Sequence, residues 1–150
     1  MKIEEKINES IKDSMKKKDN LRLDSLRAIK SAILIEKTKS GSKNQIDESL
    51  ILKILQKMVK QRNDSAKIYL EQKRDELANV EISQANIISE FLPAQLSESD
   101  LSEIIDKVII DIGAESIKDM GKVISGVSEK VSGQAEGRLI AEIVKRKLMS

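Results

Sequence analysis

The sequence predicts an all-α fold, with an N-terminal helical domain of about four helices followed by a small three-helix domain. Apolar residues recur at three- and four-residue spacing along most of the chain, and no alternating strand pattern persists. Charged residues make up 35% of the 150 residues and aromatic residues 1%, so aliphatic side chains must build the core. The pattern changes at Pro93, which divides the chain into domains at residues 1–93 and 94–150.

The first two predicted helices cover the start of the chain. The first has an apolar stripe at four-residue spacing and ends in the run Lys16–Lys18. That stripe comprises Ile3, Ile7, Ile11 and Met15. Asp19 or Asn20 can cap the second helix. The apolar set of the second helix comprises Leu23, Leu26, Ile29, Ile33 and Leu34. The polar segment Thr38–Gln45 has no period and predicts an exposed loop.

The third and fourth predicted helices complete the N-terminal domain. Asp47 starts the third helix, whose apolar pattern runs on to Tyr69. Its buried face is predicted to comprise Leu50, Ile51, Ile54, Leu55, Met58 and Val59. The fourth helix carries Leu77, Val80, Ile87 and Ile88. This helix is predicted to end near Pro93, because a residue before proline avoids helical angles. Arg62 and Asp64 are candidates for ion pairs between the third and fourth helices.

Three shorter helices are predicted after Pro93. Ser97 begins a sequence that resembles a capping box, and Gly113 is a natural C-cap. The helix between them carries Leu101, Ile104, Ile105, Val108, Ile109 and Ile112. Asp119 can cap a short helix that carries Val123, Val127 and Val131. Gly133 and Gly137 bracket a tight connection to the last helix. That helix buries Leu139, Ile140, Ile143, Val144 and Leu148.

Charge is distributed unevenly within the C-terminal domain. Residues 94–119 hold seven acidic residues against two lysines, a net charge of −5. Residues 120–150 hold six basic residues against three acidic residues, a net charge of +3. An acidic helix followed by a basic tail is a clue to the polarity of this domain, whereas the net charge of the whole chain, +2, does not by itself indicate a nucleic-acid binder.

The residue inventory excludes several classes of chemistry. The chain has no His and no Cys, so no imidazole-based triad, thiolate metal site or disulfide is possible. Neither GxxxxGK[ST] nor GxGxxG occurs. We therefore predict no catalytic residue, no metal site and no cofactor. No apolar run approaches the roughly 20 residues that span a bilayer, and the N-terminus lacks a secretory pattern, so we expect a cytoplasmic protein without membrane contact.

Four cations near the C-terminus are the candidate nucleic-acid-binding residues. Lys122, Lys130, Arg138 and Lys145 flank the turn at Gly133–Gly137 and would form a phosphate-binding patch if they converge. Gly121, at a helix start, allows a phosphate or another backbone to approach closely. The alternative interpretation is that Gly121 and Gly133 only allow helices to pack and that the lysines only increase solubility.

Several motifs, taken in order, resemble the YqeY family over nearly the whole chain. They are Leu26-Arg27 with Ser31-Ala32, Lys60-Gln61-Arg62 with Ser65, Phe91–Ser97, Gly113-Ala114, Asp119–Val123 and the Gly-x-Ala-acid-Gly turn at 133–137. The resemblance implies a C-terminal GatB/YqeY-type domain, similar to the tail of the B subunit of tRNA-dependent amidotransferases. In those enzymes the tail helps to hold tRNA while catalysis occurs elsewhere. Pro93, Gly121, Gly133 and Gly137 are structural residues of these motifs.

Three functions follow as hypotheses. The first is a non-catalytic binding module for tRNA or a tRNA–enzyme complex. The second is a protein–protein adaptor without RNA contact, with Met120, Ile124 and Met149 as groove candidates. The third is a carbon–nitrogen ligase with glutamine as amide donor. The resemblance implies this activity only through the tail domain shared with the amidotransferases, whose catalytic portion has no counterpart here.

Three positions depart from the family pattern. Gln134 stands where a basic residue is common, which removes one phosphate contact from the turn. Ser125 replaces a usual glycine, and Gln84 replaces a common acidic residue. The chain also lacks aromatic residues on which single-stranded bases could stack. Any RNA contact is therefore expected to involve phosphates and the shape of a folded duplex.

Overall fold

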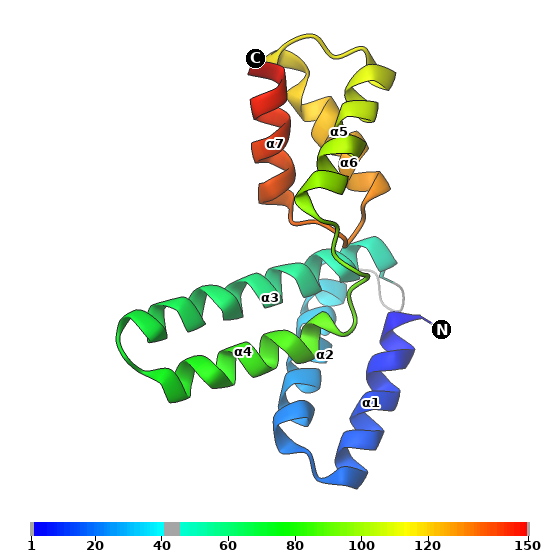
Figure 1. Cartoon of the computed structure of the whole chain (residues 1–150). Coiled ribbons are helices and arrows are strands. Elements are labelled where there is room, and N and C mark those ends of the chain that lie inside the picture. The colour runs from blue at the N-terminus through cyan, green and yellow to red at the C-terminus, as the bar shows by residue number, and fades with distance from the viewer. Residues whose placement is uncertain (1, 41–45, 150) are drawn as a thin grey trace. The chain divides into compact units, whose positions relative to one another are not determined.

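The computed structural model describes residues 2–40 and 46–149, and every regular element in this part of the chain is helical (Figure 1). The predicted all-α fold is thus confirmed. The chain folds into two compact units, residues 1–92 and 93–150. These are called the N-terminal unit and the C-terminal unit below, and each is described by itself.

The N-terminal unit consists of two helical hairpins. Its four helices are α1 (Ile3–Lys17), α2 (Asn20–Ser40), α3 (Glu48–Glu71) and α4 (Asp75–Ser89). The first hairpin joins α1 to α2 and the second joins α3 to α4, while α2 packs against both helices of the second hairpin (Figure 1). The Arg22 guanidinium donates to both carboxylate oxygens of Glu90, at 2.6 and 3.2 Å, and this hydrogen bonding raises the pKa of Arg22.

Local capping explains where α2 and α3 begin. The carboxylate of Asp19 accepts the backbone N–H of Arg22 at 3.1 Å, and that of Asp47 accepts the N–H of Ser49 at 3.4 Å. Both predicted caps are confirmed. However, α2 continues through Thr38, where the loop was expected to begin. The Thr38 hydroxyl donates to the carbonyl of Leu34 at 2.9 Å, so its polar group is satisfied within the helix. The rest of that predicted loop, residues 41–45, lies outside the described residues.

The core of the N-terminal unit departs from the predicted periodicity where helices approach closely. Its main cluster comprises Ile3, Ile7, Leu26, Ile29, Ile33, Ile51, Leu55, Met58 and Ile88. Met15, predicted to lie on the apolar stripe, is 55% exposed, and Ser14 is buried in its place. Only a short connection joins α1 to α2, and each of these helices buries one small polar side chain, Ser14 on α1 and Ser25 on α2.

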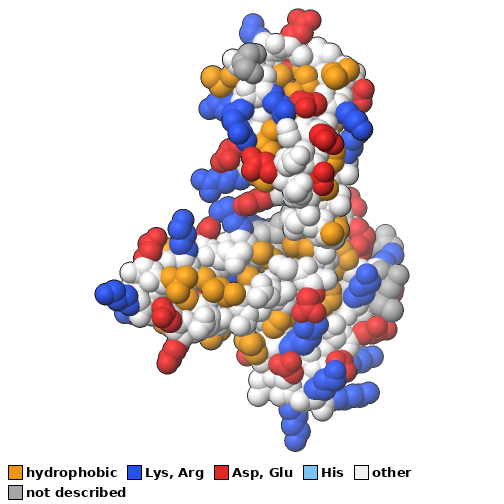
Figure 2. Space-filling model, in the orientation of Figure 1, with side chains coloured by type: hydrophobic (Ala, Val, Ile, Leu, Met, Phe, Trp, Pro, Cys, Tyr) orange, Lys and Arg blue, Asp and Glu red, His pale blue; other side chains and the backbone are white. Residues whose placement is uncertain are grey.

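A similar correction applies to α2 and α4. Leu34 is 63% exposed, and Leu77 and Val80 are also exposed. The buried face of α4 is instead formed by Ala78, Ala85 and Ile88, because small side chains allow α3 and α4 to pair closely along their length. Hydrophobic side chains consequently appear on the outside of this hairpin (Figure 2).

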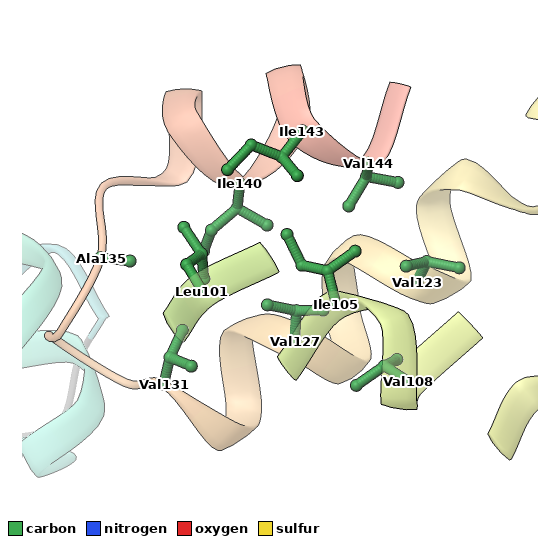
Figure 3. Close-up of a cluster of buried hydrophobic side chains, with 10 residues drawn as sticks. All are labelled: Leu101, Ile105, Val108, Val123, Val127, Val131, Ala135, Ile140, Ile143 and Val144. Atoms are coloured by element: carbon green, nitrogen blue, oxygen red, sulfur yellow. The ribbon is translucent and has the colours of Figure 1, made fainter. Parts of the chain in front are cut away.

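The C-terminal unit is a three-helix bundle with its own core. Its elements are α5 (Glu98–Ile112), the 3₁₀ turn η1 (Ile117–Asp119), α6 (Met120–Lys130) and α7 (Gly137–Met149). Helices α5 and α7 run in the same direction and α6 runs back (Figure 1). Figure 3 shows the aliphatic core: Leu101, Ile105, Val108, Val123, Val127, Val131, Ala135, Ile140, Ile143 and Val144.

Both predicted ends of α5 are confirmed. The Ser97 hydroxyl accepts the backbone N–H of Asp100 at 3.1 Å. Gly113 has φ of 74°, the left-handed conformation of a helix C-cap. Helices α5 and α6 approach each other closely at Gly126. A Cβ at that position would lie 3.1 Å from a methyl carbon of Val108 and 3.4 Å from one of Ile112.

The entry into α6 differs from the prediction. Asp119 precedes α6, but its carboxylate makes no capping bond to that helix. It turns back to accept the backbone N–H groups of Glu115 and Ser116 at 3.0 and 3.4 Å. The Ser116 hydroxyl in turn accepts the N–H of Lys118 at 3.3 Å. Asp119 therefore stabilises η1, and α6 follows directly from that turn.

Candidate nucleic-acid interface

Two glutamines join the segment before α5 to the turn between α6 and α7. The Gln95 side-chain amide donates to the carbonyl of Gly133 at 2.8 Å, and the Gln134 amide donates to that of Ala94 at 3.4 Å. The backbone N–H of Leu96 also donates to the carbonyl of Gln134 at 2.9 Å. Two motifs far apart in the sequence are thus neighbours, and the Gln134 side chain has a structural contact.

The three glycines singled out in the sequence have different surroundings. Gly133 is buried and has φ of 77°, a conformation that side chains with a Cβ rarely adopt. Gly121 and Gly137 are exposed, and a Cβ at either position would meet no atom within 4 Å. Close helix packing therefore does not require glycine at 121 or 137, whereas a Cβ at position 126 would press on side chains of α5.

The four predicted cations occupy the two ends of the α6–α7 hairpin. Figure 3 places Val123 and Val144 toward one end of the core and Val131 toward the other. Lys122 and Lys145 are sequence neighbours of the first two, while Lys130 ends α6 and Arg138 begins α7. All four side chains are exposed. Lys122 and Lys145 thus lie toward one end of the hairpin, and Lys130 and Arg138 lie toward the other.

The candidate cations also lie on different faces of their helices. Arg138 and Lys145 are seven residues apart on α7, so they share one face about 10 Å apart along the helix axis. Lys130 lies on the side of α6 that faces α5, because its ammonium group is 3.8 Å from the carboxylate of Asp111. The solvent-facing side of α7 is thus the place where two predicted cations share one surface.

Acidic side chains are interspersed among the cations of α6 and α7. Arg138 pairs with Glu142 at 3.9 Å within α7. Two further cations reach α5: Arg146 contacts Glu98 at 3.1 Å, and Lys147 contacts Asp106 at 2.8 Å. Figure 2 shows positive and negative side chains mixed over the visible face of this unit. The acidic and basic halves of the C-terminal sequence therefore fold against each other.

Lys122 and Lys145 differ from Lys130 and Arg138 in having no carboxylate partner among the described side chains. Neither forms an ion pair with a side chain in the described part of the chain. Lys122 does act on Asp119 through its charge. The pKa of Asp119 is lowered mainly by the N–H groups of Glu115 and Ser116, and Lys122 adds a smaller effect. Both ammonium groups are accessible to an incoming anion.

A groove between α5 and α7 had no signal in the sequence. Ile143 contributes apolar surface to it, and the remaining lining is polar: Glu98, Ser99, Ser102, Arg146 and Lys147. Both basic residues of this lining are engaged by carboxylates of α5. The sites of such cross-helix pairs depend on how helices align, which composition does not reveal.

Comparison with known proteins identifies the family. The family model described as "Yqey-like protein" matches residues 4–148. The chain belongs to the YqeY-like family. The match includes all the α-helices described above apart from their outermost residues, so it covers both units of this YqeY-like chain.

Named relatives of this YqeY-like chain occur in fungi. It is similar to "Altered inheritance of mitochondria protein 41, mitochondrial" of Clavispora lusitaniae, with 36% identity over 98 residues, 65% of this chain and 55% of that protein. The protein of the same name in Meyerozyma guilliermondii is 33% identical over 102 residues, covering 68% and 52%. This chain spans about half the length of the relatives that it matches.

The relatives' name refers to mitochondria and states no activity. A cytoplasmic location for this chain stays a prediction. No helix among residues 2–40 and 46–149 has both the length and the apolar character that a membrane span requires.

A YqeY motif in α3 makes a contact that its sequence partly predicted. The Arg62 guanidinium donates to the side-chain carbonyl of Gln84 on α4 at 3.2 Å and to the backbone carbonyl of Met58 at 3.3 Å. Asp64 accepts from Lys60 of its own helix at 2.8 Å. Arg62 therefore does link the two helices, through a hydrogen bond to the Gln84 amide in place of the predicted ion pair.

The groove candidates for a protein partner have different environments. Met120 and Ile124 pack against the core of the C-terminal unit. Met149 is exposed at the end of α7. That these three side chains line one groove for a protein partner stays a prediction.

Proposed function

We propose that the C-terminal unit of this YqeY-like chain binds folded RNA of the tRNA class, alone or in a tRNA–enzyme complex, without catalysing a reaction. The observation that supports this most directly is the shared exposed face of Arg138 and Lys145 on α7. Lys145 has no ion-pair partner among the described side chains, so phosphate can approach it without displacing a carboxylate.

The expected contact is electrostatic and sequence-independent. Arg138 can present its guanidinium fork to a phosphate, and the ammonium groups of Lys145 and Lys122 act as point charges. Neither of the two aromatic residues, Tyr69 and Phe91, lies in the C-terminal unit, so base stacking on it is not part of the proposal. Affinity should therefore fall steeply as salt rises.

Amide transfer is not part of this proposal. A glutamine-dependent transferase needs a nucleophile that releases ammonia, and the chain lacks thiol and imidazole, two of the groups that commonly supply or activate one. The carbon–nitrogen ligase label remains our third hypothesis, and glutamine-dependent amide transfer by the pure chain would rescue it.

A tRNA titration across a salt series tests the proposal. Filter binding of total tRNA to the full chain should show a salt-dependent dissociation constant. Arg138→Ala with Lys145→Ala should weaken binding about tenfold and reduce the slope of log K against log salt by about 2.

The matched control replaces Lys53 and Lys57 by Ala, since both are exposed on α3 and form no ion pair with described residues. This control should leave the slope nearly unchanged. Absence of tRNA binding at about 50 mM salt, or an equal loss in the control, would refute the proposal.

A further inference from the structure

Helix α2 has buried apolar residues on one side and exposed apolar residues on another. Leu26, Ile29 and Ile33 are buried in the core of the N-terminal unit. Leu34 and Ile35 nevertheless point away from this core, at 63% and 59% exposure. The outer side of α2 is therefore an unpartnered apolar surface.

A small groove adjoins this surface between α1 and α2. Ile7, Ile33 and Leu34 give it an apolar lining, and its volume is about 120 Å³. That size is comparable with the roughly 150 Å³ cavity that holds one benzene molecule, so the groove suits one aliphatic side chain. Its rim is polar and comprises Glu4, Asn8, Lys30 and Lys37. Lys37 is fixed there by Glu4, whose two carboxylate oxygens lie 2.9 and 3.0 Å from its ammonium nitrogen.

The charges around the groove have mainly one sign. Arg27, Lys30 and Leu34 follow the spacing i, i+3, i+7, which places two cations on the helical stripe that leads to the exposed leucine. Both cations are exposed and neither forms an ion pair within the described residues. Asp24 is the one exposed carboxylate on the described part of α2. A partner that covers Leu34 therefore meets positive charge beside it.

We infer that this face of α2, with its groove, docks an acidic amphipathic helix of a partner protein. One apolar side chain of that helix fills the groove, its neighbours cover Leu34 and Ile35, and its carboxylates face Arg27 and Lys30. A helix suits this site better than a strand, because every element around the site is helical and offers no open backbone ladder to an extended peptide. Nucleic acid fits less well, since phosphates cannot cover exposed aliphatic side chains.

Two synthetic peptides serve as probes for this inference. The first is a helical peptide of about 18 residues with Leu at i, i+3, i+4 and i+7 spacing and Glu at its polar positions. The second has Lys in place of every Glu. Fluorescence anisotropy with the full chain should show micromolar binding of the Glu peptide and at least tenfold weaker binding of the Lys peptide. Amide NMR shifts should change on α1 and α2.

Variants of exposed residues locate the binding. Leu34→Ser should weaken the Glu peptide at least tenfold, whereas Leu77→Ser, at an exposed leucine of α4, should not. Arg27→Glu with Lys30→Glu should reverse the preference toward the Lys peptide. The same reversal of charge at Lys53 and Lys57 on α3 is the matched control.

Several results would overturn the inference. It would be wrong if neither peptide bound, or if the preference between the peptides were unchanged in the charge-reversed variant. It would also be wrong if the changes in amide NMR shift fell outside α1 and α2. A dimer in sedimentation that Leu34→Ser dissociates would assign the face to a second copy. Binding of anionic vesicles or tRNA lost in the Arg27 and Lys30 variant would assign it to those partners. The tRNA experiment on α7 is independent, so each proposal can fail alone.

Discussion

Asp119 was correctly predicted to be a capping residue, but its carboxylate caps the 3₁₀ turn η1 and not α6. Its sequence position predicted a cap for α6. In the structure it accepts two backbone N–H groups from the residues before η1. A three-residue 3₁₀ turn has no apolar period, so the sequence could not show that a turn precedes the helix.

The lowered pKa of Asp119 gives a pH dependence at this position. Its pKa lies below the ordinary 3.8, because the N–H groups of Glu115 and Ser116 favour the charged carboxylate. The stabilisation is therefore present above pH 3.8 and is lost as pH falls through the lower folded-state pKa. Thermal unfolding of wild type and Asp119→Asn between about pH 2 and 6 should show a stability gap that closes at the acid end.

Glu103→Gln is the control for this measurement, because Glu103 is exposed on α5 and has no ion-pair partner among described residues. Its difference from wild type should be small throughout. A gap for Asp119→Asn that stays constant down to the acid end of the series would contradict the assigned role of the carboxylate.

Residue-level prediction succeeded where a signal is local to the chain. The caps at Asp19, Asp47, Ser97 and Gly113 depend on a few neighbouring residues, and all four are observed. Burial was harder to predict. Spacing shows which side chains share a stripe, but it does not show which neighbouring helix covers that stripe. Leu34 and Leu77 are exposed for this reason.

At the scale of elements, acidic residues of α5 partly neutralise the basic tail. The sequence separates an acidic segment from a basic one, which favoured a cationic end. The bundle places α5 beside α6 and α7, where Glu98, Asp106 and Asp111 contact cations of these two helices. Such alignment depends on tertiary packing, so the four candidate cations could be found from the sequence but their counter-charges could not.

This arrangement predicts that acids of α5 compete with RNA phosphates. Replacing Glu98 by Gln, Asp106 by Asn and Asp111 by Asn should raise tRNA affinity by about tenfold, since exposed ion pairs contribute up to about 1 kcal/mol each. Filter binding at fixed salt measures the change.

The control must add the same charge without freeing a cation. Asp100→Asn, Glu103→Gln and Glu115→Gln do so, because these three acids form no ion pair with described residues. Their combined effect should be clearly smaller. Equal gains from both triple variants would mean that only net charge matters.

At the scale of the whole molecule, the sequence predicted an all-α chain with a change of pattern at Pro93. The structure has two compact units that meet between Leu92 and Pro93, each with its own aliphatic cluster. That the units are independently stable domains, with boundaries at 1–93 and 94–150, stays a prediction. Hydrophobic periodicity locates helices, but it carries no information about how firmly one helical group depends on another.

Core truncations test this independence. Ile105→Ala in the C-terminal unit and Leu55→Ala in the N-terminal unit each remove a fully buried aliphatic side chain. Each should destabilise its own unit by about 2–5 kcal/mol. Hydrogen exchange followed by mass spectrometry should show faster exchange only in the helices of the altered unit. Acceleration throughout the chain by either variant would mean that the units unfold together.

The contact at Gly126 links two positions that lie on different helices of the bundle. A methyl group added there would press on Val108, so a larger residue at 126 requires the Val108 side chain to shift or to become smaller. Related chains should therefore show compensating changes at these two sites. A protein engineer who alters one should expect to redesign the other, with Val108→Ala as the first rescue for Gly126→Ala.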